Sequence, residues 1–167
     1  MLIGTPLWVK KDWLDKLGLG MPETIEEWHA VLTAFKNDDP NGNGQADEIP
    51  LRLDPGQLSM NKAFLGAWGI TDSFYQVDGV VKYGPIQPEF KEFLQTMSRW
   101  YAEGLIDPDY LSGDSNLWDA KITNNTLGAF TGYTGSGIGR YLQMMEGKGG
   151  GFDLAGAPNV ALKKGET

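Results

Sequence analysis

One stretch of ten residues, from Asp39 to Glu48, restricts what this chain can fold into more than any other. It reads Asp-Pro-Asn-Gly-Asn-Gly-Gln-Ala-Asp-Glu. Side chains with oxygen atoms stand at alternate positions, at Asp39, Asn41 and Asn43, and Gly44 follows them. Alternate side chains that point inward, with a glycine where the backbone turns back, form the first half of an EF-hand calcium loop. The stretch therefore predicts a tight loop that surrounds a hard cation.

The expected donors of this loop are all oxygen atoms. Gln45 would contribute its backbone carbonyl, and the adjacent Asp47 and Glu48 would complete the shell. Three carboxylates in a shell of about six protein oxygens suit calcium better than magnesium, which keeps several of its waters. The predicted metal ligands are Asp39, Asn41, Asn43, Gln45, Asp47 and Glu48.

The end of the loop departs from the EF-hand. An EF-hand has a bidentate glutamate at loop position twelve, inside a helix, but here that position is Pro50. Proline removes a hydrogen-bond donor and breaks a helix interior, so 49–53 is expected to be a short extended segment. A calcium sensor that opens a pair of helices is therefore not expected. A turn that binds no metal is the alternative, because Asn and Gly are also frequent turn residues.

Composition limits the class of protein. The 167 residues, 41% of them hydrophobic, suffice for one domain with its own core. A net charge of −8 argues against nucleic acid or an anionic membrane surface as a partner. The chain has no cysteine, which excludes thiol catalysis. It begins inside an apolar segment and carries no signal peptide, so we expect a piece of a longer protein.

Hydrophobic periodicity predicts helices that alternate with short strands. Thr24 and Glu27 form a capping box that begins one helix, and the Asp78-Gly79 pair predicts a two-residue hairpin turn. The only histidine, His29, is expected at the surface or partly buried rather than in catalysis. Further helices are predicted over 10–19, 58–69, 88–103, 115–124 and 138–145, and strands over 7–9, 49–53, 74–77, 80–83, 127–131 and 152–158.

Two features of this pattern could bind a ligand. The helix over 88–103 carries an apolar stripe, which at helical spacing is expected to be core rather than a binding face. The small-residue loop over 132–137 joins a strand to a helix and exposes backbone N–H groups, as ligand-binding loops at strand ends do. Its glycines do not match a nucleotide-binding motif. The stripe consists of Phe90, Phe93, Leu94, Met97, Trp100 and Tyr101.

Short motifs recur in a characteristic order along essentially the whole chain. They are Lys11-Asp12-Trp13-Leu14, Pro22-x-Thr24 with Glu27-Trp28, Asp78 to Tyr83, Tyr101 to Pro108, Leu127 to Phe130 and Ala155 to Pro158. Together they resemble the second lobe of family 1 extracellular solute-binding proteins of sugar ABC importers. The resemblance implies an α/β fold, one lobe of a type II periplasmic-binding-protein-like structure, with a central short-stranded sheet flanked by helices. Residues 1–167 would then be a single domain, without the first lobe and the signal peptide.

The same resemblance implies a function. The protein would capture an oligosaccharide for an ABC importer as an extracellular, cell-surface lipoprotein. Its partners would be the sugar, the first lobe of the same protein and the membrane subunits of the importer. The metal loop is similar to that of alginate- and oligosaccharide-binding members of the family, where calcium is structural. Sugar contacts would come from the loops after the strands at 49–53 and 127–131, which hold Gln57, Ser59, Asn61, Tyr133, Thr134 and Ser136.

Two other functions are open to a chain with 22 carboxylates. A glycoside hydrolase needs a pair of carboxylates as acid and base, but the clearest acidic cluster lies in the metal loop and no other pair is marked. A calcium-dependent carbohydrate-adhesion module would be expected to carry a second calcium loop, but the sequence shows a single such loop, from Asp39 to Glu48. We therefore expect a binding protein without catalytic residues.

Overall fold

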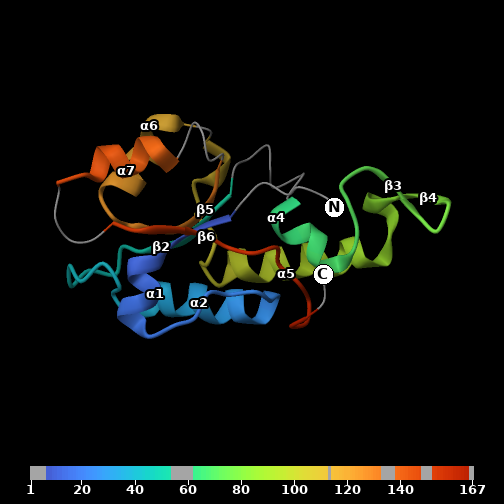
Figure 1. Cartoon of the computed structure of the whole chain (residues 1–167), viewed down its shortest axis with the longest axis horizontal. Coiled ribbons are helices and arrows are strands. Elements are labelled where there is room, and N and C mark those ends of the chain that lie inside the picture. The colour runs from blue at the N-terminus through green and yellow to red at the C-terminus, as the bar shows by residue number, and fades with distance from the viewer. Residues whose placement is uncertain (1–6, 54–61, 113, 133–137, 148–151, 166–167) are drawn as a thin grey trace.

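A four-stranded mixed sheet forms the centre of the computed structural model, with helices on both of its faces (Figure 1). The structure describes residues 7–53, 62–112, 114–132, 138–147 and 152–165. The strand order is β2-β5-β1-β6. The strands are β1 (Leu7–Lys10), β2 (Ile49–Arg52), β5 (Leu127–Thr131) and β6 (Leu154–Gly156).

The sheet combines both kinds of strand pairing. β1 runs antiparallel to β5 on one side and to β6 on the other, and Val9 lies opposite Ala129 and Ala155. β2 runs parallel to β5, with Arg52 opposite Phe130. All five residues of β5 are buried, because a central strand between two layers of helices has no face in water.

The larger layer of helices covers one face of the sheet (Figure 1). It consists of α1 (Lys11–Leu17), α2 (Ile25–Asn37) and α5 (Pro88–Ala102). The predicted capping box begins α2: the Glu27 amide donates to Thr24 Oγ1 at 3.1 Å, and the Thr24 amide donates to Glu27 Oε2 at 3.2 Å. Edge-to-face aromatic pairs fill the core here, with Phe64 5.5 Å from Trp28 and 5.4 Å from Trp100 between ring centroids.

The smaller layer lies on the opposite face (Figure 1) and consists of α6 (Ser115–Thr123) and α7 (Gly139–Met145). The buried residues on this side form a separate cluster, with Ile122 from α6, Tyr141 from α7 and Leu127 and Phe130 from β5. The predicted α/β class with helices on both faces of a short-stranded sheet is confirmed.

The predicted hairpin is also confirmed. β3 (Phe74–Val77) and β4 (Val80–Tyr83) pair antiparallel, and Asp78 and Gly79 have φ of 50° and 82°, as a two-residue turn of the primed type requires. The helix predicted over 58–69 is described from Lys62 onward, as α4 (Lys62–Leu65) and the 3₁₀ turn Gly66–Trp68. Two further 3₁₀ turns are Gly84–Ile86 and Tyr110–Ser112.

Three elements differ from the sequence-based expectation. The last strand is shorter than 152–158, since only Leu154–Gly156 pairs with β1. The first helix ends at Leu17, because Gly18 takes the left-handed conformation that closes a helix. The apolar stripe of α5 is only partly core: Leu94 and Tyr101 are 50% and 49% exposed. That part of the prediction is wrong, because six apolar positions form a stripe wider than the surface that the neighbouring elements cover.

The expectation for His29 agrees with the structure. His29 is partly exposed and its Nε2 lies 2.6 Å from Glu103 Oε2. In the part of the chain that the structure describes, no helix is both long enough and apolar enough to cross a membrane.

Gly128 gives a direct test of the packing between the sheet and the larger layer of helices. A Cβ there would lie 2.5 Å from Phe35 Cδ2, 2.9 Å from Trp13 Cζ3 and 3.0 Å from the Pro50 carbonyl oxygen. We expect Gly128→Ala to lower the free energy of unfolding by about 1–3 kcal/mol or more, since overpacking displaces rigid neighbours. Gly139→Ala is the control, because a Cβ there has no atom within 4 Å. Equal urea midpoints for the two variants would contradict this account.

Candidate functional site

The loop between α2 and β2 is organised around the side chain of Asp39. Asp39 Oδ1 accepts from the amides of Gly42 and Asn43 at 2.8 and 3.1 Å, and Oδ2 accepts from the amide of Gly44 at 3.0 Å. Asp39, Gly42 and Gly44 all have positive φ. The backbone thus wraps around the carboxylate at the first position of the loop, as the sequence pattern predicts.

The next alternate positions join the same network. Asn41 Oδ1 accepts from the Asn43 amide at 2.9 Å, and Asn43 Oδ1 accepts from the Gln45 amide at 2.7 Å. The side-chain amide groups of both asparagines donate to Asp47, at 3.0 Å from Asn41 and at 3.1 and 3.2 Å from Asn43. The structure therefore brings five of the six predicted ligands into one set of hydrogen bonds.

The sixth predicted ligand, Glu48, has one carboxylate oxygen that lacks a partner. Its Oε1 is buried and accepts no hydrogen bond from any described residue. Burial raises the pKa of the Glu48 carboxyl above its ordinary value, and the nearby carboxylates of Asp47 and Asp39 raise it further. A buried acceptor without a donor lowers the stability of the fold. A bound cation would supply the missing contact and offset the repulsion between the carboxylates.

The donor set of the loop fits a hard divalent cation, since it offers carboxylate, amide and carbonyl oxygens without nitrogen or sulfur ligands. Within the described ranges, however, no three His, Asp or Glu side chains converge as a metal centre. The side-chain oxygens are instead engaged by backbone and asparagine amides. Calcium binding therefore stays a prediction.

Lys16 supports the loop from outside, a contact that the sequence analysis missed. Its Nζ donates to the carbonyl oxygens of Asp39 and Pro40 at 3.2 and 2.9 Å. A Cβ at Gly42 would lie 2.7 Å from this Nζ. A lysine 23 residues before the loop gives no local signal, because the contact depends on how α1 packs beside α2.

The predicted sugar-contact residues lie outside the described residues, but the strands that lead to them are well placed. β2 and β5 are parallel neighbours, so both strands end at the same edge of the sheet. Ligand sites of open α/β sheets form at the carboxyl ends of such strands. The structure therefore brings the ends of the two strands to one edge, and Gln57, Ser59, Asn61, Tyr133, Thr134 and Ser136 lie outside the described residues.

A buried charge cluster lies at this edge of the sheet. Arg52, the last residue of β2, has no exposed surface, and its Nη1 donates to Asp107 Oδ2 at 2.6 Å. Lys121 Nζ of α6 donates to both Asp107 oxygens at 2.8 Å, and the Asp109 amide donates to Oδ1 at 2.9 Å. The Arg52 guanidinium also lies 5.0 Å from the Trp118 ring centroid. The cluster joins three parts of the chain, which are β2, α6 and the segment that follows α5.

The hydrogen bonds of this cluster decide the protonation of Asp107. Burial acts to raise the pKa of Asp107, but donation from Lys121, from the Asp109 amide and from Arg52 outweighs it, and the pKa lies below its ordinary value. Asp107 is thus an ionised carboxylate that pairs with two cations, Arg52 and Lys121. The sequence carried one sign of this cluster, an arginine among the apolar residues of the segment 49–53, which is expected to be extended.

The neighbouring contacts of α6 and α7 hold a tyrosine in its neutral form. The Tyr141 hydroxyl donates to Asp119 Oδ1 at 2.9 Å, and Arg140 pairs with the other oxygen of Asp119. Burial, followed by the hydrogen bond to Asp119, raises the pKa of Tyr141 to about 12. An un-ionised tyrosine and a paired aspartate serve here to join two helices rather than to transfer protons.

The charge cluster predicts a specific dependence of stability on pH. We expect Asp107→Asn to lower the free energy of unfolding by about 3–5 kcal/mol at neutral pH, because it leaves buried cations without their counter-ion. Asp107 has a lowered pKa in the folded state, so its stabilisation is complete above the unfolded pKa of about 3.9 and is lost as the pH falls below it. The difference between wild type and Asp107→Asn in urea unfolding should therefore shrink below about pH 4.

Asp109→Asn is the matched control for this measurement. Its carboxylate contacts the same Lys121 Nζ at 3.1 Å, but its side chain is 56% exposed. An exposed pair contributes about 0–1 kcal/mol, so Asp109→Asn should have little effect. A similar loss of stability in both variants would mean that burial of the Arg52 pair is not what matters.

Known proteins with this fold are solute-binding proteins of ABC transporters. The chain superposes with a TM-score of 0.76 on the Streptococcus pneumoniae ABC-transporter substrate-binding protein FusA in complex with kestose, at 32% identity over 95% of this chain and 32% of that chain. The alginate-binding protein AlgQ2, solved without calcium ion, gives a TM-score of 0.75 at 26% identity over 90% of this chain and 31% of that one. An EF-hand mutant of FusA in complex with fructo-nystose gives a TM-score of 0.66 at 34% identity, over 75% of this chain and 27% of that chain.

Sequence comparison finds the same class. The fructooligosaccharide ABC transporter substrate-binding protein FusA of S. pneumoniae serotype 4 is 39% identical over 128 residues, which are 74% of this chain and 24% of FusA. Lipoprotein LipO of Bacillus subtilis strain 168 is 30% identical over 152 residues, 87% of this chain and 30% of LipO. No protein-family model matches the chain.

The fold is thus that of periplasmic solute-binding proteins. The chain is homologous to the solute-binding proteins of sugar ABC transporters, as its sequence motifs predicted, and spans about a quarter to a third of their length. Such proteins bind substrate and are not enzymes, so the expectation of a non-enzymatic class is confirmed.

Proposed function

We propose that this chain is the second lobe of a two-lobe protein that captures an oligosaccharide for an ABC importer. The similarity to FusA, whose structure holds kestose, carries the proposal. Its supporting geometry is the single α/β unit in which β2 and β5 end at one edge of the sheet. The loops that follow these strands would face the first lobe across a cleft, and closure of the two lobes would exclude water from the sugar.

The buried charge cluster has a clear part in this function. Sugar-binding loops need a rigid base, because groups that move must be ordered when the ligand binds and this lowers affinity. Arg52 and Asp107 hold the end of β2 to the segment after α5, and Lys121 adds α6. These residues would not touch the sugar. They would keep the strand end from shifting when the lobes close.

A structural calcium ion in the loop over Asp39–Glu48 is the second part of the proposal. The donor set and the buried, unpartnered Glu48 oxygen support it, and so do two structural relatives described by an EF-hand mutation and by the absence of calcium. The ion would neutralise the acidic loop and fix the connection from α2 to β2. It would be held by Asp39, Asn41, Asn43, Gln45, Asp47 and Glu48.

The setting follows from the same relatives. LipO is described as a lipoprotein and FusA as an ABC-transporter protein. The full-length protein would accordingly be held at the outer surface of the cell membrane, where its partners are the sugar and the membrane subunits of the importer.

Calcium should stabilise the fold. At a free calcium concentration one hundred times the dissociation constant, a site present only in the folded state adds about 2.7 kcal/mol. We therefore expect chelation to lower the melting temperature of the wild type, and Asp39→Ala to remove the difference between calcium and chelator. Asp38→Ala is the matched control, since Asp38 is an adjacent exposed carboxylate outside the ligand set. A wild-type melting curve that ignores both calcium and chelator would refute the metal site.

The 167-residue chain should bind oligosaccharide far more weakly than the full-length protein. A ligand in a good site has about 70–90% of its surface buried, and one lobe supplies only part of those contacts. The cost of association, on the order of 4 kcal/mol or more, remains in full. Calorimetry with a panel of oligosaccharides on both proteins tests this. Micromolar binding to the chain alone would show that its site is complete without a first lobe.

A further inference from the structure

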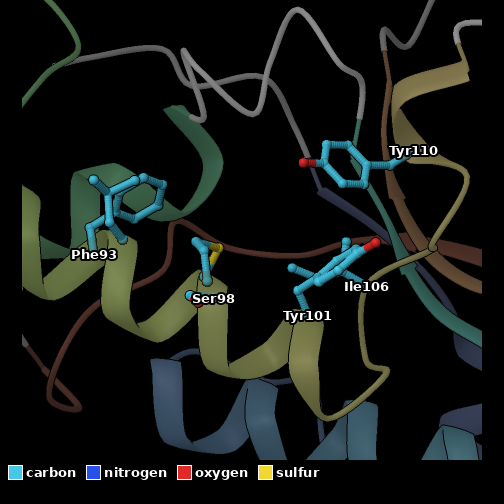
Figure 2. Close-up of a pocket in the computed structure, with 7 residues that line it drawn as sticks. Phe93, Ser98, Tyr101, Ile106 and Tyr110 are labelled. Carbon is cyan, nitrogen blue, oxygen red and sulfur yellow. The ribbon is translucent and has the colours of Figure 1, made fainter.

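The exposed part of the α5 stripe lines a groove of about 250 Å³ (Figure 2). Its floor is formed by the buried side chains of Phe93, Met97 and Ile106, and Tyr101 and Tyr110 stand at one end. Leu94 and Ser98 complete the lining from α5. The groove is therefore built by two separate parts of the chain, a helix and the segment from Ile106 to the 3₁₀ turn at Tyr110.

The two tyrosines hold their rings nearly at right angles. The ring centroids lie 5.9 Å apart with an angle of 77° between the planes. In Figure 2 the Tyr110 ring extends over the groove with its hydroxyl pointing toward the middle, while the Tyr101 ring is seen edge-on above α5. Tyr101 is 49% exposed. The groove thus combines aromatic faces, which can cover an apolar ligand surface, with hydroxyl groups at their tips.

The size and charge of the groove limit what can occupy it. Complete ligand sites measure about 300–1,000 Å³, so a space of about 250 Å³ suits one ring of a longer molecule rather than a whole oligosaccharide. All seven lining side chains are uncharged, and the chain carries a net charge of −8. The groove therefore offers no cation for an acidic sugar and favours a neutral one.

The groove lies beside the edge of the sheet where β2 ends. Ile106, in its floor, forms a parallel bridge with Leu51, and the next amide, of Asp107, donates to the Leu51 carbonyl at 2.8 Å. The same Asp107 holds Arg52 through the buried ion pair. A ligand unit in the groove would thus lie next to the strand end from which the proposed sugar-binding loop leaves.

We propose that this groove is a stacking subsite that takes one ring of a neutral oligosaccharide against Tyr101 and Tyr110. The inference rests on the proposed carbohydrate function and extends it to a place that the sequence analysis assigned to the core. A sugar ring has an apolar face of C–H groups and an edge of hydroxyls. The aromatic faces and the buried apolar floor would contact the apolar face, and the Tyr110 hydroxyl, which points toward the middle of the groove, could bond the hydroxyl edge.

The test is an NMR titration of the 167-residue chain, which carries every lining residue, with the methyl groups of Leu94, Met97 and Ile106 as probes. Neutral oligosaccharides of one to five units and an acidic uronate series are added to about 50 mM, well above a Kd on the order of 1 mM for so small a contact. We expect shifts at these methyl groups that strengthen with chain length in the neutral series and are weaker in the acidic one.

Substitutions then connect the shifts to the tyrosines. Loss of a stacking contact weakens binding by about tenfold at most, so Tyr101→Ala and Tyr110→Ala should weaken the response by a few-fold to tenfold. Tyr101→Phe, which keeps the ring, should retain most of it. Tyr83→Ala is the control, because Tyr83 is a partly exposed tyrosine on β4 outside the groove.

The remaining outcomes separate the stacking subsite from the proposed capture of a carbohydrate. Shifts at Leu53 and Gly132, at the ends of β2 and β5, without shifts in the groove would overturn the subsite but leave carbohydrate capture intact. Groove shifts with single sugars and no gain with chain length would support a sugar site and count against an oligosaccharide ligand. No groove shift with any sugar would mean that the subsite is wrong. Shifts that depend on protein concentration alone would also overturn it and would mean that the groove packs against a second copy of the chain.

Discussion

The ion pair between Arg52 and Asp107 is the interaction on which the arrangement of this chain depends most. Neither side chain has exposed surface, and Lys121 from α6 donates to the same carboxylate. A buried pair of this kind contributes little net stability compared with apolar packing, but removal of one partner is severe, because it leaves a charge without water. The importance of the pair lies in its position. The Asp107 carboxylate, in the segment that follows α5, binds both the end of β2 and α6. The end of β2 and the α5 groove both adjoin that junction.

The metal loop poses the opposite electrostatic problem, too many like charges rather than a balanced set. Asp39 and Asp47 are occupied by amide donors, and Glu48 keeps a buried oxygen without a donor. Hydrogen bonds from neutral amides can organise such a loop but cannot cancel its charge. A divalent cation can both organise the loop and cancel its charge. The chemistry of the loop is thus in line with the EF-hand and the calcium ion that are named for two structural relatives. Lys16 adds a single positive charge at the outer side of the loop, at the carbonyls of Asp39 and Pro40.

The two faces of α5 divide the helix between stability and recognition. Phe93, Met97 and Trp100 are buried against the core, whereas Leu94 and Tyr101 are half exposed beside the Tyr110 turn. A monomeric protein seldom leaves large apolar side chains exposed around a hollow without use for them. In a lobe that is proposed to act with a second lobe, this surface lies next to the strand ends where the ligand is expected, and a sugar ring gives it a specific occupant.

The sequence by itself determined the elements and the class of protein. The capping box at Thr24, the hairpin turn at Asp78-Gly79 and the alternate oxygens from Asp39 are local patterns, and local patterns encode local conformation because their partners are a few residues apart. The tertiary structure decided the rest. Lys16 reaches Asp39 across 23 residues, Arg52 meets Asp107 across 55, and Tyr101 meets Tyr110 only because the chain turns back after α5. The periodicity of α5 could mark an apolar stripe, but not which part of it remains exposed, since exposure depends on the width of the surface that packs against the helix.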